Sequence, residues 1–360
     1  MNRPIIEIKN LLVRRNNRTL LQVPQLAFRS GTIVSVIGPN GAGKSTMLLS
    51  LMRLVIPDSG EILYRGQRIL PGISIHRYRR KMSMVFQEPL LLNTSVYNNI
   101  ASGLKIRGMN RRNIRPAVEE MMDLFGIAHL SKRSARSLSG GEAQRVSLSR
   151  ALAVSPEILL MDEPFSSLDA PTRESLIADL DRIIRDRGIT VIFATHDRSE
   201  AIRLADEIIV LNEGRIIQSG TPAEITLSPA DEFVAFFIGT ETILSGAVTN
   251  AAEGVFTVSV NGSGVEIMGE VEPGRRVTFC INPENIIFSA NFPETSARNS
   301  FRGKVVKAVS QGLFHKIYFD CGFILVGYVT GRSMETLGIR PGRELVASFK
   351  ATAVHVIKVA

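Results

Sequence analysis

Long apolar runs are missing from this chain of 360 residues. A helix that crosses a bilayer needs about 18 to 20 consecutive apolar residues, and no stretch of the sequence approaches that length. The amino terminus also lacks the apolar core of a signal peptide. We therefore expect a protein that stays on the cytosolic side of the membrane.

Cysteine is also scarce. Cys280 and Cys321 have neither the spacing of metal ligands nor the density of a secreted disulfide scaffold, so each is expected to be a small buried hydrophobic residue. A composition typical of disorder is missing too, because 44% of the residues are hydrophobic and 21% are charged. At this length the chain should fold into about two to three domains.

Acidic residues are fewer than basic ones, which gives the chain a formal net charge of +9. Such an excess admits nucleic acid, anionic lipid or a small anion as a partner, and it also fits a solvated basic face. The sequence has no ribbon of basic residues rich in aromatics, as a nucleic-acid-binding surface would require. No nucleic acid partner is therefore expected.

Strand-like and helix-like segments alternate over the first part of the chain. Buried strands are predicted at 32–37, 158–161 and 189–194, and helices follow them in turn. This alternation implies a parallel sheet in an α/β domain over residues 1–240, with a helical subdomain at about 88–140. Beyond it, short strands separated by Gly, Asn and Pro predict a β-rich domain over residues 241–360, with modules at 243–290 and 296–360.

A glycine-rich turn between the first strand and its helix matches the Walker A pattern. In this pattern backbone N–H groups close around phosphate oxygens, and the helix that follows points its positive dipole end at the anion. The lysine supplies charge to the β and γ phosphates, and the serine offers its hydroxyl to Mg²⁺. ATP and Mg²⁺ are therefore the expected cofactors. The nine residues are Gly38, Pro39, Asn40, Gly41, Ala42, Gly43, Lys44, Ser45 and Thr46.

Two acidic residues end the strand at 158–161. Asp162 can hold Mg²⁺ through water, and Glu163 can act as a general base toward the attacking water. Paired acids at a strand end are also common on solvated surfaces. Their position relative to the other motifs therefore decides their interpretation.

The segment Leu138–Gln144 resembles the signature motif of the ABC ATPases, and it lies just ahead of the strand that carries Asp162. The resemblance covers residues 5 to about 235 and implies an α/β P-loop NTPase core. It also implies that Gln87 senses Mg²⁺ and the attacking water, that 166–169 form the D-loop ending in Asp169, and that His196 is the switch histidine. In that family Ser139, Gly140 and Gly141 grip the γ phosphate bound to the opposite subunit, so the active form is a homodimer.

One departure concerns the base of the nucleotide. The family stacks adenine on an aromatic residue ahead of the P-loop, but the segment from Ile8 to Ala27 contains no aromatic residue. Arg14 or Arg15 falls there, and a guanidinium plane can stack on a base face. We expect Arg15 to pack against adenine; the alternative is two solvated arginines and looser selection of the base.

The absence of a fused membrane segment, of a second ATPase cassette and of a long coiled coil favours an importer subunit within the family. This resemblance implies separate membrane permease subunits as partners. It also implies an external solute-binding protein that acts through the permease, and a peripheral location on the cytoplasmic face of the inner membrane.

The tail resembles the TOBE-type, molbindin-like modules, which are small OB-like β domains that bind molybdate or tungstate. The resemblance implies that hydroxyl, amide and cationic groups surround an oxyanion, which is the chemistry that a tetrahedral dianion requires. The matching residues are Ser296, Arg298, Thr330, Ser333 and Lys350. We therefore expect an importer of tungstate or molybdate whose tail can sense the oxyanion. Three alternatives stay open: a tail that only dimerises, an importer of sulfate, phosphate, iron or sugar, and a soluble ATPase that acts on nucleic acid.

Overall fold

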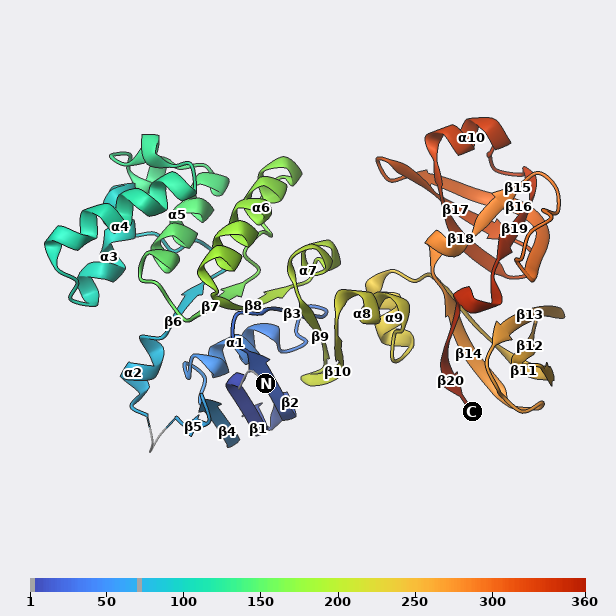
Figure 1. The fold of residues 1–360 in the computed structure, drawn as a ribbon, viewed down its shortest axis with the longest axis horizontal. Coiled ribbons are helices and arrows are strands. Elements are labelled where there is room, and N and C mark those ends of the chain that lie inside the picture. The colour runs from blue at the N-terminus through green and yellow to red at the C-terminus, as the bar shows by residue number, and fades with distance from the viewer. Residues whose placement is uncertain (1–3, 70–72) are drawn as a thin grey trace. The chain divides into compact units, whose positions relative to one another are not determined.

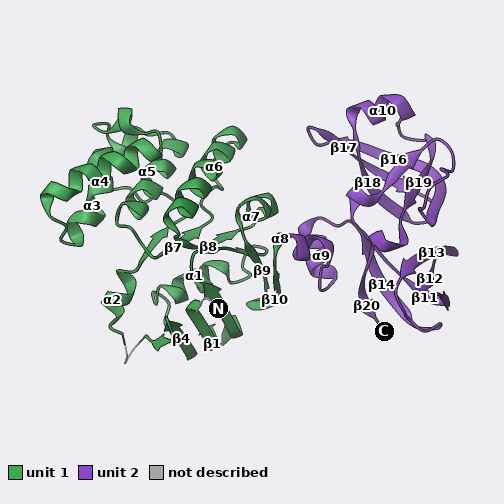
Figure 2. Ribbon diagram, in the orientation of Figure 1, with its two compact units in different colours: residues 1–222 green, residues 223–360 purple. Residues whose placement is uncertain are grey.

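The structure, a computed structural model, describes residues 4–69 and 73–360. It divides into two compact units, residues 1–222 and 223–360 (Figure 2). The sequence predicts this boundary at 240, so the two divisions differ by the short helices α8 (Pro222–Leu227) and α9 (Glu232–Ile238). The segment between these helices is tied to the second unit, because His355 Nε2 lies 3.1 Å from the carbonyl oxygen of Pro229.

A ten-stranded sheet is formed by the described residues of the first unit, in the order β5-β4-β1-β2-β10-β9-β3-β8-β7-β6 (Figure 1). Strands β9, β3, β8, β7 and β6 run parallel, whereas β5, β4, β1 and β2 pair antiparallel. The parallel strands read as continuous apolar runs, which is typical of strands that are covered on both faces. Their bounds are β1 (Pro4–Arg15), β2 (Arg18–Arg29), β3 (Ile33–Ile37), β4 (Ser59–Tyr64), β5 (Gln67–Arg68), β6 (Met82–Val85), β7 (Ile158–Asp162), β8 (Thr190–Thr195), β9 (Glu207–Asn212) and β10 (Arg215–Gly220).

The topology of the parallel strands brings three loops to one edge. β3 pairs with β8, and β8 pairs with β7, so that Ile37 lies opposite Thr195 and Asp162 opposite Ala194. All three strands therefore end together, and the loops that follow them meet at the carboxyl edge of the sheet, where ligands bind in open α/β sheets.

Seven helices accompany this sheet in the described part of the first unit. They are α1 (Lys44–Leu51), α2 (Ile75–Arg79), α3 (Val96–Ile106), α4 (Arg111–Leu124), α5 (Gly140–Ala153), α6 (Ala170–Arg187) and α7 (Arg198–Leu204). Figure 1 shows α3, α4 and α5 grouped beside β6, where α5 contacts both other helices. Helix α4 begins at Arg111 because the Asn110 side chain caps it, and Pro116 is accommodated inside it.

The second unit contains two five-stranded antiparallel sheets, ordered β13-β12-β11-β14-β20 and β15-β19-β16-β17-β18. Apolar residues from both sheets form a single core cluster, which includes Phe256, Phe279, Phe319 and Phe349. The bounds are β11 (Thr242–Ala252), β12 (Val255–Val260), β13 (Ser263–Met268), β14 (Arg276–Ile281), β15 (Ile287–Ser289), β16 (Asn299–Ser310), β17 (Phe314–Asp320), β18 (Ile324–Thr330), α10 (Gly331–Leu337), β19 (Glu344–Phe349) and β20 (Val354–Val359).

The two sheets do not follow the two predicted sequence modules. β15 lies in the first segment of sequence but pairs with β19, and β20 ends the chain but pairs with β14. Each module therefore completes its sheet with a strand from the other module. A division of the sequence at about 290 assigns β15 and β20 to the wrong sheets.

Candidate functional site

The glycine-rich turn predicted to bind phosphate lies between β3 and α1. Gly43 has a φ of 105°, which favours glycine, and a Cβ at this position would lie 2.8 Å from the carbonyl oxygen of Leu20. Lys44 is 6% exposed, and its Nζ donates to the carbonyl oxygens of Gly38 at 2.8 Å and Pro39 at 3.2 Å. The Lys44 ammonium group is thus held beside the glycine-rich loop at the start of α1. Positive charge and backbone N–H groups at a helix start together suit an anion.

The turn forms one wall of a cavity of ≈ 510 Å³, here called the phosphate pocket. Its other walls come from four separate segments, which carry Leu20, Gln87, Glu163 and His196. The lining residues are Leu20, Asn40, Gly41, Ala42, Gly43, Lys44, Ser45, Thr46, Gln87, Glu163 and His196. Gln87, Glu163 and His196, predicted from distant motifs, therefore meet the P-loop in one cavity.

Glu163 lines this pocket and contacts two of its other lining residues. It is 9% exposed, its Oε2 lies 2.7 Å from His196 Nδ1, and its Oε1 lies 3.6 Å from Lys44 Nζ. Its φ of 47° is in the left-handed region, which costs a non-glycine residue about 1–3 kcal/mol and is typical of functional positions. The carboxylate is held between a histidine and a lysine that also line the pocket.

Asp162 provides a test of whether the pocket suits a metal. Its Oδ1 is buried and has no hydrogen-bond partner among the described residues. Burial raises the pKa of this carboxyl, while the Ser45 hydroxyl opposes that shift. No cluster of three or more His, Cys, Asp or Glu side chains suited to a metal exists in the described segments. A cation here would thus rely on Asp162, Ser45 and phosphate oxygens, which is the oxygen set that Mg²⁺ prefers.

A second cavity, the signature pocket, contains the other predicted phosphate contacts. Ser139 caps α5, because its Oγ accepts from the Glu142 backbone N–H and its own N–H donates to the Glu142 carboxylate. The bond from the Ser139 N–H lowers the pKa of Glu142. Asp169 caps α6 in the same way, accepting from the Thr172 N–H at 2.9 Å. The pocket is lined by Ser139, Gly140, Gly141, Glu142, Arg145, Ser167, Leu168, Asp169, Pro171, Thr172 and Ser175.

The two pockets share no lining residue. One chain therefore has the P-loop in one cavity and the signature motif in another.

Comparison with known proteins identifies the family. The sequence profile described as ABC transporter matches residues 21–166, and that of the TOBE domain matches residues 295–356. The molybdate/tungstate import ATP-binding protein of Pyrococcus horikoshii is 37% identical over 330 residues, which cover 91% of this chain and 93% of that protein. The chain belongs to the ABC transporter family. The predicted family, fold class and ATPase activity coupled to transport are thereby confirmed.

Two further relatives support this ABC transporter assignment. The spermidine/putrescine import ATP-binding protein of Fusobacterium nucleatum is 36% identical over 296 residues, 81% of this chain and 78% of that protein. A solved structure of cbiO1 from Clostridium perfringens, described as part of the ABC transporter complex cbiONQ, has a TM-score of 0.59 and 29% identity. It covers 62% of this chain and 91% of that chain.

The predicted contact to adenine is not among the residues that line the phosphate pocket of this ABC ATPase. Arg15 ends β1 and is exposed, while Leu20 on β2 lines the pocket. Leu20 was missed because nothing in the sequence around it indicates a ligand. The close approach of Gly43 and Gly214 to its carbonyl oxygen, which places it beside the P-loop, is visible only in the fold.

The predicted oxyanion residues of the TOBE-type tail fall into separate groups. Ser296 and Lys350 line one cavity, the tail pocket, together with Glu284, Asn285, Ile287, Pro293, Thr295, Ala297, Ser348, Phe349 and Ala353. Thr330 and Ser333 do not line this pocket; Thr330 caps α10, and its Oγ1 lies 3.1 Å from Ser333 Oγ. Arg298 pairs with Glu266 at 3.3 Å. The structure thus brings two of the five predicted residues together around one cavity.

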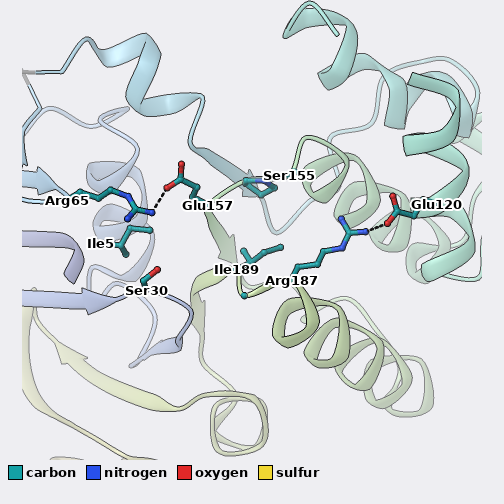
Figure 3. A pocket seen from close by; sticks show the side chains of 10 residues that line it. Ile5, Ser30, Arg65, Glu120, Ser155, Glu157, Arg187 and Ile189 are labelled. Carbon is teal, nitrogen blue, oxygen red and sulfur yellow. Dashed lines mark hydrogen bonds and ion pairs between the residues drawn. The ribbon is translucent and has the colours of Figure 1, made fainter. Parts of the chain in front are cut away.

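Another cavity of the first unit was not predicted from the sequence (Figure 3). An ion pair on each side of it joins separate segments: Arg187 with Glu120, and Arg65 with Glu157. Burial alone would raise the pKa of Glu157, but hydrogen bonds from Lys81, Tyr64 and Arg65 outweigh it and lower the pKa to about 2. These charges are all mutually paired, so the cluster serves the packing of the ATPase unit.

None of the helices in the described segments combines the length and apolar character that a membrane span requires.

Proposed function

We propose that the chain hydrolyses ATP through Glu163 acting as general base. The observation that carries this assignment is the pair of Glu163 and His196, whose side chains lie 2.7 Å apart and both line the phosphate pocket. A base must reach the proton that it abstracts. In this proposal His196 orients the Glu163 carboxylate and contacts the γ phosphate, and Lys44 neutralises phosphate charge. Gln87 contacts the attacking water.

We further propose that Mg²⁺ accompanies ATP, with Ser45, Asp162 and Gln87 on its protein side. When bound, the cation would supply positive charge that offsets the negative charge of the phosphate groups. The buried and unpaired Oδ1 of Asp162 supports this assignment, since an unpaired buried carboxylate oxygen is costly without such a partner.

Glu163→Gln tests the catalytic assignment. The amide keeps the shape of the side chain but cannot accept the proton, so kcat should fall by about 10²–10⁴-fold. Binding of a fluorescent ATP analogue should change less than twofold. A variant that hydrolyses ATP at the wild-type rate would refute the role of Glu163.

The signature residues support a homodimer as the working form. Ser139, Gly140 and Gly141 open α5, whose backbone N–H groups suit a phosphate, yet they line a different cavity from the P-loop. In a dimer with head-to-tail contacts, the signature pocket of one chain would close over the γ phosphate held by the other, and Asp169 would lie beside it.

Partner subunits follow from the import systems to which the relatives belong. We propose that membrane permease subunits dock beside Gln87, where Phe86, Leu90 and Leu92 are exposed. Exposed apolar side chains gathered near a catalytic glutamine suit a protein partner that must sense ATP. The chain would then lie on the cytoplasmic face of the inner membrane, and an external solute-binding protein would deliver substrate to the permease. No nucleic acid partner is proposed.

For the substrate we propose an oxyanion, molybdate or tungstate, with sensing by the tail pocket. The P. horikoshii relative carries that name and aligns over 91% of this chain. Lys350 and Ser296 offer a cation and a hydroxyl within the tail pocket, which fits an anionic ligand. The relative named for spermidine and putrescine belongs to the same family. Membership of the family therefore does not identify the substrate, and a measurement of ligand binding is needed.

Calorimetry of the full chain with tungstate, molybdate, sulfate and spermidine tests this proposal. Heat with tungstate or molybdate at micromolar concentration, and none with sulfate or spermidine, is the expected result. No heat with either metal oxyanion would refute sensing by the tail and leave it a role in dimerisation.

A further inference from the structure

Arg173 contacts two of the loops that surround the proposed reaction. It lies on the first turn of α6, just after the D-loop, and its side chain is 29% exposed. Its Nη2 donates to the carbonyl oxygen of Leu168 at 3.0 Å, and its Nη1 donates to Asp197 Oδ2 at 3.2 Å. One guanidinium therefore joins the D-loop, which follows β7, to the loop of His196, which follows β8.

The same guanidinium faces a buried group behind the switch histidine. Glu200 is 3% exposed, and its Oε1 lies 3.8 Å from Arg173 Nε. Its other oxygen, Oε2, accepts from Thr195 Oγ1 at 2.6 Å, and Thr195 Oγ1 accepts from the Asp197 backbone N–H at 3.0 Å. A buried carboxylate is costly unless a cation and hydrogen bonds compensate it. Arg173 thus supports the residues on both sides of His196.

This arrangement needs the shape of arginine as well as its charge. The planar guanidinium directs separate N–H groups toward Leu168 and Asp197, whereas a lysine ammonium acts as a point charge on a flexible stem. Arg173 Nε makes no hydrogen bond within the described part of the chain, so the contact with Glu200 is electrostatic.

We propose that Arg173 is a positioning residue that fixes the D-loop and the His196 loop relative to each other, and that it acts on hydrolysis through His196 and Glu163. This inference rests on the proposed roles of those two residues. Loss of Arg173 would free the His196 loop, and the 2.7 Å contact between His196 and Glu163 would no longer be held. Small displacements of a catalytic group cost about 10²-fold in rate.

The test compares Arg173→Ala, Arg173→Lys and the control Arg182→Ala in the full chain. Arg182 lies on the same helix, is 62% exposed and pairs only weakly with Asp179 at 3.8 Å. We expect Arg173→Ala to lower kcat by about ten- to hundredfold with KM for ATP within twofold, because an oriented contact rather than binding is lost. Arg173→Lys should recover part of the rate, and Arg182→Ala should match the wild type.

Histidine NMR supplies a readout that a loss of general stability would not produce. The chain has five histidines, so a histidine-labelled sample gives few signals, and His196→Ala identifies the one that matters. Arg173→Ala should shift or broaden the His196 signal and leave the other four in place.

An unchanged His196 signal, or a kcat within twofold of wild type, would overturn the inference. So would a change in all five histidine signals, since that result means a structural role. Failure of the proposed function is distinguishable, because it would appear as normal hydrolysis by Glu163→Gln.

Discussion

The phosphate pocket of the first unit and the tail pocket of the second differ in how their polar side chains are held. In the phosphate pocket Glu163 contacts both His196 and Lys44. Glu163 and His196 each follow directly after the end of a parallel strand. In the tail pocket Ser296 lies in a long loop and Lys350 precedes a single turn of 3-10 helix, and both are exposed. A site whose side chains contact one another through hydrogen bonds and ion pairs is preorganised before its ligand binds. A site built from exposed loop residues needs its ligand or a second chain to fix those side chains.

This difference also explains what the sequence could and could not predict. The P-loop is one continuous segment, and the loops of Glu163 and His196 end adjacent parallel strands, so the order of motifs was enough to bring them together. The tail residues lie far apart in sequence, mostly in the loops and turns that connect antiparallel strands. The sequence did not indicate that Ser296 and Lys350 share a cavity that Thr330 and Ser333 do not line.

Two further features lay beyond sequence reasoning. The exchange of β15 and β20 between the sheets of the tail depends on pairing over long separations, which residue patterns do not encode. The cluster of Tyr64, Arg65, Lys81 and Glu157 gathers side chains from three segments that no motif links.

Among the substitutions that test the contrast between the ATPase unit and the tail, we expect one in the signature pocket to change the ATPase rate most. A Cβ at Gly141 would lie 2.7 Å from Thr172 Cγ2, whereas one at Gly140 would have its nearest contact at 3.9 Å. Gly141→Ala must therefore displace the Thr172 side chain, whose hydroxyl donates to Asp169 at 3.0 Å, and kcat should fall by about ten- to hundredfold. Gly140→Ala is the matched control and should lose less. Steady-state ATPase rates check this, and equal losses in both variants would contradict the steric account.

Lys350→Ala should produce an effect of comparable size, confined to the tail. A hydrogen bond to a charged group contributes about 1.5–3 kcal/mol, so tungstate affinity measured by calorimetry should fall by about ten- to hundredfold. The ATPase rate without oxyanion should stay within twofold of wild type. Lys358→Ala, an exposed lysine of β20 that does not line the tail pocket, is the control and should bind tungstate normally.

The smallest effect concerns stability and pH. The folded pKa of Glu157 is lowered to about 2 from its ordinary value of 4.5, so its contribution is complete above pH about 4.5 and is lost as the pH falls toward 2. Glu157→Gln should lower Tm by a few degrees at pH 7, and the gap to wild type should close as the pH falls. Thermal melts at several pH values check this, and a gap that stays constant would contradict the assigned pairing.

The central claim is that the P-loop of one chain and the signature motif of another enclose the same phosphate. It can be tested with Asn40→Cys and Ser139→Cys together in the Glu163→Gln background, with both native cysteines replaced by serine. Mild oxidation with ATP and Mg²⁺ should give disulfide-linked dimers on a denaturing gel, and oxidation without nucleotide should give few. A chain that remains monomeric on the gel with ATP and Mg²⁺ present would contradict the account.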